Sequence, residues 1–156
     1  MRMRVVLSLS AALLVLLAAP AVRAAGPTAC QVFPSQTAST LLGSPVGLPV
    51  DMAGIGCGYS NKDASATATV TVVDQPALTA EEFQKSINML AAGGGAKAET
   101  ISGLGEANAF WIRPGNQNSI SVLYHHKMIS LAVQKAMTPA LKSAMIDTIR
   151  QIVSKF

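Results

Sequence analysis

The sequence predicts an α+β domain: an antiparallel sheet of about five strands with helices packed on one face, in the order α-β-β-α-β-β-β-α. Apolar and polar residues alternate over residues 66–73 and again over 120–133, which is the period of half-buried strands. Two other segments repeat apolar residues every three to four positions, as amphipathic helices do. Because most connections are too short for parallel crossovers, we expect the strands to pair antiparallel.

The chain opens with the pattern of a secretion signal. Arg2 and Arg4 precede a long apolar run, and Ala24 ends the segment with the small residue that signal peptidase accepts. The sequence therefore predicts a signal peptide over residues 1–24 and one secreted domain over residues 25–156. The apolar run is shorter than the ~20 residues that span a bilayer, so a retained anchor is the less favoured alternative.

Removal of that segment changes the charge of the protein. The full chain has a formal net charge of +4, but three of its 12 Lys and Arg residues lie in the first 24 positions, which leaves nine against eight Asp and Glu. Nucleic-acid binding needs several clustered cations, so this nearly neutral balance argues against it.

Cys30 and Cys57 are the only cysteines, and both lie in the predicted secreted domain. An oxidising compartment makes such a pair a disulfide, and a loop of this length contributes about 3.6 kcal/mol in the chain-entropy model. Lipidation of Cys30 is the alternative, but that residue stands well beyond the apolar run. We expect a periplasmic or extracellular protein without a stable membrane anchor.

The first half of the domain is expected to contain a short helix and two strands. Ser35 is the predicted N-cap of the helix, and Gly43 is suited to end it. Residues 44–56 contain two prolines and three glycines, which predicts an irregular connection. One strand is expected over residues 57–60 and the other over residues 66–73.

Two further helices are expected. Thr79 and Glu82 form a capping box at the start of the first, and the glycines at 93–95 end it. Thr138 and Pro139 supply an N-cap and a first-turn proline for the second. We interpret the stripe of this C-terminal helix as core rather than as a membrane-binding face. The stripe consists of Leu141, Met145, Ile149, Ile152 and Phe156.

Strand pieces are expected over residues 98–102 and 107–112, and a β-hairpin over residues 120–133. Alternation along a strand sends Phe110 and Trp111 to opposite faces of the sheet. An exposed Trp111 beside Arg113 would mark a ligand surface. The favoured alternative is that a second layer or the terminal helix covers the tryptophan.

His125 and His126, the only histidines, are the other candidate ligand residues. Neutral imidazole binds metals, but neighbouring strand residues point to opposite faces, so we favour solvation at the hairpin tip. Glu81 beside Glu82 resembles a carboxylate pair, yet both stand in the first turn of a helix, where the macrodipole favours anions. The sequence thus predicts no catalytic residue, metal site or cofactor.

Several short motifs along the chain resemble those of a bacterial cell-envelope domain of unknown function, a family of small secreted proteins and lipoproteins. The resemblance implies an envelope location and supplies no catalytic residue. The motifs are Cys30, Leu41-Leu42-Gly43, Cys57-Gly58-Tyr59 and the run Gly103-Leu104-Gly105-Glu106-Ala107-Asn108-Ala109-Phe110-Trp111, followed by a hairpin and a final helix.

From these observations the expected function is a non-enzymatic binding or accessory module that contacts an envelope protein or a small ligand. A small hydrolase that uses His125 or His126 is one alternative, and a purely structural envelope protein is another. A cleft that gathers a histidine, a serine and a carboxylate would favour the hydrolase.

Overall fold

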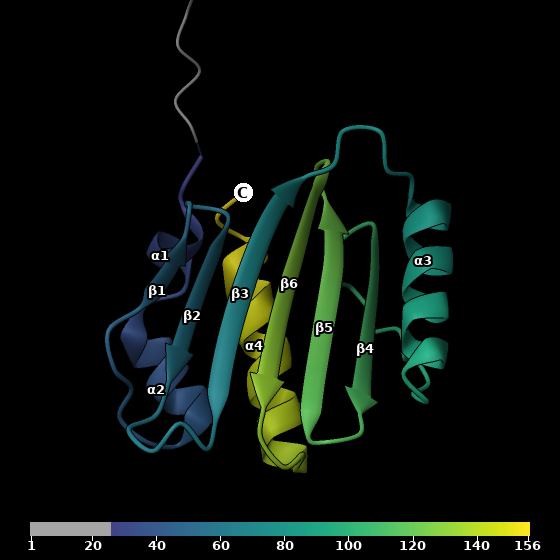
Figure 1. Cartoon of the computed structure of the whole chain (residues 1–156). Coiled ribbons are helices and arrows are strands. Elements are labelled where there is room, and N and C mark those ends of the chain that lie inside the picture. Colours follow the sequence, from purple (N-terminus) through teal and green to yellow (C-terminus); the bar gives the residue numbers. More distant parts are fainter. Residues whose placement is uncertain (1–25) are drawn as a thin grey trace, which may run out of the picture.

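The structure, a computed structural model, describes residues 26–156. The predicted signal peptide lies outside the described residues. Six strands form one sheet with helices on both faces (Figure 1). The strands are β1 (Val50–Met52), β2 (Gly56–Ser60), β3 (Thr67–Asp74), β4 (Ala107–Arg113), β5 (Gln117–Tyr124) and β6 (Lys127–Gln134). The helices are α1 (Ala29–Val32), α2 (Ser35–Leu42), α3 (Ala80–Gly93) and α4 (Pro139–Val153).

The strand order is β1-β2-β3-β6-β5-β4, and every neighbouring pair is antiparallel. The central pair is β3 with β6, whose register runs from Thr67 opposite Gln134 to Asp74 opposite Lys127. This pair joins the first half of the chain to the second. It leaves β1 and β4 as the two edges of the sheet.

The α+β class and the antiparallel pairing are confirmed, with differences in detail. The sheet has six strands because β1 forms within the segment predicted as an irregular connection. The strand expected over residues 98–102 is reduced to a single bridge between Glu99 and Phe110. Helices lie on both faces rather than one, because α3 packs opposite the other three (Figure 1).

The main core lies between the sheet and the layer of α1, α2 and α4. The strands other than the exposed edge strand β1 contribute to it, and β3 and β6 do so with alternate residues, as their period-2 pattern predicts. In β3 these residues are Ala68 and Val70, and in β6 they are Ile129, Leu131 and Val133.

Helix α4 covers this face with the predicted stripe. Met145 and Ile149 are fully buried, and Ile152 is nearly so. The helix begins as expected, since the Thr138 hydroxyl accepts a hydrogen bond from the backbone N–H of Leu141. The interpretation of the stripe as core is confirmed. Among residues 26–156, no helix combines the length and the apolar character needed to cross a membrane.

The predicted disulfide is present between Cys30 and Cys57, whose Cα atoms are 4.9 Å apart. It joins α1 to β2, so the start of the domain is tied to the sheet. Next to it, the rings of Phe33 and Tyr59 meet edge to face with centroids 5.6 Å apart. Burial of Tyr59 raises the pKa of its hydroxyl.

The Asn108 side chain holds the Gly-Leu-Gly segment, residues 103–105, in place before β4. Its side-chain amide donates to the carbonyls of Ile101 and Leu104, and its oxygen accepts from the Ile101 N–H. Gly105 has a positive φ of 64°, and a Cβ there would lie 2.6 Å from the Leu123 carbonyl oxygen. Only glycine allows this close approach, which fixes the entry into β4.

We expect Ile149→Ala to lower the free energy of unfolding by roughly 2 to 5 kcal/mol, the cost of truncating a packed isoleucine. Chemical denaturation measures it. Met89→Ala is the control, because Met89 also lies on a helix but is 61% exposed. Equal midpoints for the two variants would contradict the placement of Ile149 in the core.

We expect Cys57→Ala to cost about 2 to 5 kcal/mol of stability, as is typical for a native disulfide in a small secreted domain. Cys30→Ala should reproduce most of the loss, because either change opens the same loop. The measurement is denaturation of both variants beside the oxidised and reduced wild type. A midpoint that reduction leaves unchanged would rule out this contribution.

Candidate functional site

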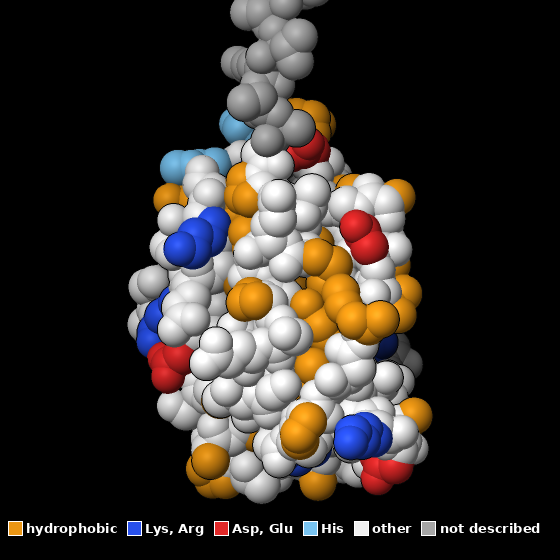
Figure 2. All heavy atoms as spheres, turned by 90° about the vertical axis from the view of Figure 1, so that its left-hand side faces the viewer, with side chains coloured by type: hydrophobic (Ala, Val, Ile, Leu, Met, Phe, Trp, Pro, Cys, Tyr) orange, Lys and Arg blue, Asp and Glu red, His pale blue; other side chains and the backbone are white. Residues whose placement is uncertain are grey.

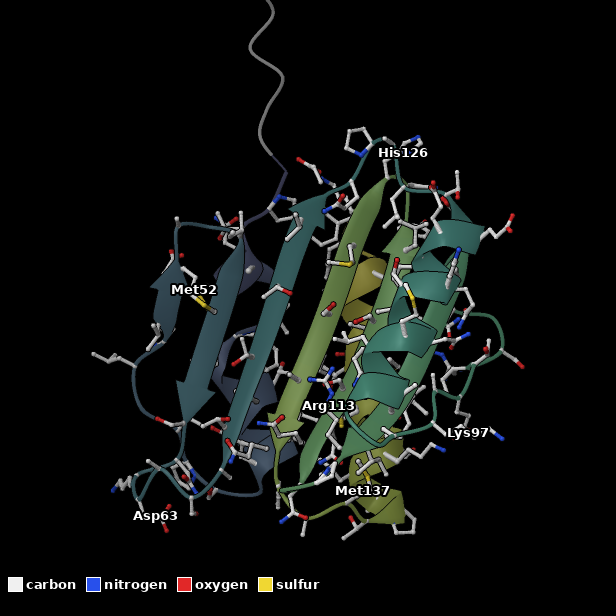
Figure 3. All side chains as sticks on the ribbon, turned by 45° about the vertical axis from the view of Figure 1, so that its right-hand side comes forward. Met52, Asp63, Lys97, Arg113, His126 and Met137 are labelled. Carbon is white, nitrogen blue, oxygen red and sulfur yellow. A yellow bond between two sulfur atoms is a disulfide. The ribbon has the colours of Figure 1, made fainter. Side chains whose placement is uncertain are left out.

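The second face of the sheet is covered unevenly. Helix α3 packs on the β4–β5 end, whereas β6, β3 and β2 are left open on this side (Figure 3). The candidate site is the place where the covered and open halves meet. Its residues come from β3, β4, β5 and β6.

Helix α3 covers Trp111, whose side chain is only 4% exposed. The helix contributes Phe83, Ile87 and Ala91 to this small core, and the sheet adds Ala109 and Leu123. The favoured prediction that a second layer covers Trp111 is therefore confirmed, and the alternative of an exposed Trp111 at a ligand surface is wrong. The covering element is α3 and not the terminal helix, because α4 lies on the other face.

The start of α3 follows the predicted capping box. The Glu82 backbone N–H donates to the Thr79 hydroxyl, and the Glu82 carboxylate accepts from the Thr79 N–H and hydroxyl. These hydrogen bonds lower the pKa of the Glu82 carboxyl. Glu82 thus serves the helix terminus rather than a catalytic pair.

Arg113 is held between Trp111 and the last turn of α3. Its guanidinium carbon lies 6.0 Å from the centroid of the Trp111 ring, and Nη2 donates to the Leu90 carbonyl over 3.3 Å. A Cβ at Gly94 would come within 3.1 Å of Nε, so the glycine leaves room for the guanidinium. The cation also suits the negative end of the helix macrodipole.

A hollow of about 250 Å³ lies beside Arg113. Arg113 is the only charged residue among those that line it. Figure 3 shows this arginine in front of the sheet, near the lower end of α3. The lining residues are Thr67, Thr69, Arg113, Gln117, Asn118, Ser119, Ala132, Val133 and Gln134.

The hydroxyl and amide groups of the hollow are available to a ligand. Within residues 26–156, the side chains of Thr67, Thr69 and Ser119 have no hydrogen-bond partner in the protein. The buried Asn118 instead uses its amide on backbone carbonyls, including those of Val133 and Lys135. The polar groups that face the hollow are therefore separate from those that hold the fold together.

From this hollow the open face continues to the β1 edge over small residues. Thr71 lies opposite Ser130 of β6, whose hydroxyl is 2.7 Å from that of the buried Ser121 on the side away from β1. At the edge, Met52 packs against Gly56. Hydrophobic side chains gather on the side of the molecule where β1 is the edge (Figure 2). The exposed ones in this segment are Leu48, Val50, Met52 and Ile55.

The two histidines form the turn between β5 and β6, and both have positive φ, 46° and 62°. Consecutive left-handed residues suit a two-residue hairpin turn. The His125 ring stacks on Tyr124 with centroids 4.0 Å apart, and its backbone N–H donates to the Glu106 carboxylate. β5 separates them from Arg113 by about 24 Å of strand. The structure thus brings Trp111 and Arg113 together but keeps them apart from the two histidines. Figure 3 shows Arg113 and His126 at opposite ends of the sheet.

Two other hollows are less suited to bind a ligand. The one along α3 is lined by residues of that helix alone, so it is the surface of one element. The other lies between α2 and α4 and has Asp147 as its charged residue. Among residues 26–156, no group of three or more His, Cys, Asp or Glu side chains is arranged to hold a metal ion.

Sequence reasoning found Arg113 but missed its companions. Thr67 and Thr69 were visible as the polar positions of an alternating strand, which gave a weak signal. Gln117, Ser119 and Gln134 gave none, because the pairing of β4 with β5 brings the first two beside Arg113 and the pairing of β5 with β6 adds the third.

No family model matches the chain, and no curated protein matches it. Among solved structures, the chain is similar to the solution structure of cyanobacterial PsbP (CyanoP) from Synechocystis sp. PCC 6803. The identity is 13%, the TM-score is 0.37, and the match covers 69% of this chain and 79% of the other.

We expect Phe83→Ala to loosen α3 and to cost roughly 3 to 5 kcal/mol, because Phe83 fills the core under the helix. Trp111, the only tryptophan, should then gain solvent contact and shift its fluorescence emission to the red. Met89→Ala on the outer side of α3 should leave the emission unchanged. An emission spectrum of Phe83→Ala identical to that of the wild type would contradict the packing of α3 over Trp111.

Proposed function

We propose that this protein is a non-enzymatic binding or accessory module of the bacterial cell envelope and that its ligand lies on the open half of the sheet. The observation that carries the proposal is the hollow beside Arg113, where unpaired donor groups face an open surface. The disulfide between Cys30 and Cys57 supports an oxidising, extracytoplasmic compartment. The predicted signal peptide is the route that we propose to that compartment.

The groups in the hollow favour binding over catalysis. Hydroxyls of Thr67, Thr69 and Ser119 share it with an arginine and with glutamine amides, which donate hydrogen bonds but do not act as general bases. The histidines required by the hydrolase alternative lie at the opposite end of β5. The arrangement is suited to recognise acceptor atoms of a ligand.

The open face is accessible without a change in the fold. Ala132 is exposed in the middle of it, and the neighbouring Thr69 and Ser119 are half-buried. A ligand there would contact β3, β5 and β6, with Arg113 of β4 beside it.

The test is photo-cross-linking in cells, with a benzophenone amino acid at position 132 or, as the control, at the exposed Lys155 beyond α4. We expect an adduct from position 132 that is absent from position 155. Intact mass then shows whether the adduct is a small molecule or a protein. Thr69→Arg should abolish the adduct, because the long arginine side chain would occupy the sheet surface next to Ala132.

Equal adducts from both positions, or an adduct that Thr69→Arg leaves unchanged, would contradict the placement of the ligand on this face. Circular dichroism and the denaturation midpoint of Thr69→Arg serve as the folding control.

A further inference from the structure

We propose that the hollow beside Arg113 is a carboxylate-binding site that takes a small organic acid about the size of an amino acid. The inference rests on the proposed function, since it names the ligand chemistry of the same open face. It is carried by the charge, the geometry and the free hydrogen-bonding groups of the hollow.

Arg113 carries a charge that the described protein does not neutralise. The ion pairs within residues 26–156 are Lys127 with Asp74, Lys142 with Glu99, and Arg150 with Asp147. Arg113 takes part in none of them, and no acidic residue lines its hollow. An anion is the ligand that would complete this site.

The guanidinium also has an unsatisfied donor. Nε of Arg113 is buried and has no hydrogen-bond partner in the described residues. The one hydrogen bond of the guanidinium to the described protein runs from Nη2 to the Leu90 carbonyl, at the long distance of 3.3 Å. Nη1 has no partner among residues 26–156 either and, unlike Nε, is not buried, so it is the donor of the guanidinium that a ligand can reach.

The arginine is already held in place before any ligand arrives. Trp111 supports one side of the guanidinium, and the α3 terminus at Gly94 lies against Nε. With Nε against the helix end, the terminal Nη1 and Nη2 edge of the planar guanidinium supplies two parallel N–H groups, and their spacing matches the two oxygens of a carboxylate. Little side-chain entropy is lost on binding, which favours affinity.

Neutral donors surround the position where the carboxylate would bind. Thr67 and Thr69 lie on one side of the hollow, and Ser119 lies on the same strand as Gln117. Hydroxyls and amides add hydrogen bonds to carboxylate oxygens without adding charge. A single cation with neutral donors balances a monoanion better than a phosphate group, which carries about −1.5 to −2 charges at neutral pH.

The size of the hollow limits the ligand. Its volume of about 250 Å³ lies below the range of about 300 to 1,000 Å³ that is typical for drug-sized molecules. A carboxylate with a short side group fits this space. A long peptide or a polymer would extend beyond the hollow, over the open face of the sheet toward β1.

The experiment uses the full protein and two matched probes, N-acetylalanine and its neutral amide. Tryptophan emission reports binding, because Trp111 is the only tryptophan and lies 6.0 Å from the Arg113 guanidinium. The ¹H–¹⁵N resonance of Arg113 Nε gives a second readout. We expect saturable changes with N-acetylalanine, none with the amide, and weaker binding at high salt.

Arg113→Gln should weaken binding by about ten- to hundredfold, the loss of charge-assisted hydrogen bonds. Arg113→Lys should be intermediate, because it keeps the charge and loses the two-pronged geometry. Arg150→Gln is the matched control and should bind like the wild type, because Arg150 lies on α4, against the other face. Calorimetry measures affinity in the variants, where the tryptophan environment is itself altered.

Equal binding of the acid and the amide would overturn the proposal. So would tighter binding of inorganic phosphate than of N-acetylalanine, or an equal loss in Arg113→Gln and Arg150→Gln. If no acid binds while the adduct from position 132 persists, the carboxylate inference fails and the proposed function stands. If no adduct forms from position 132 either, both fail.

Discussion

Burial of Trp111 beneath α3 is the packing constraint on which the rest of this sheet face depends. The β4–β5 end carries Ala109, Trp111 and Leu123, which are apolar and need a cover. The remaining strands present mostly small or polar residues on the same face, such as Thr69, Ser130 and Gly58, so they can remain in contact with water. One helix therefore suffices, and its position creates a step between a covered and an open half.

The boundary between the two halves explains why Arg113 differs from the paired lysines Lys127 and Lys142. Lys127 and Lys142 meet carboxylates on the surface, where exposed pairs add little stability. Arg113 instead stands at the end of α3, supported by Trp111 and partly withdrawn from water. The contacts that fix its position leave most of its donors free, so a structural contact and a ligand site can share one side chain.

The opposite face is constrained by the disulfide and by α4. The bond from Cys30 to Cys57 fastens α1 against the sheet, and Lys135 donates from Nζ to the Leu42 carbonyl at the end of α2. These contacts anchor the helical layer at two separate points. A rigid layer on one side keeps the sheet in shape, so the open face needs no support of its own.

Most of the local structure could be predicted from the order of the amino acids, because strand alternation, caps and glycine stops depend on neighbouring residues, although β1 was missed. The sequence predicted α3 from Thr79 and Glu82, the buried stripe of α4, and the pairing of Cys30 with Cys57. It could not decide which face α3 would cover, since its apolar stripe fits either one. It also could not place Thr69 and Ser119 beside Arg113, because strand order and register bring these distant residues together only in the folded sheet.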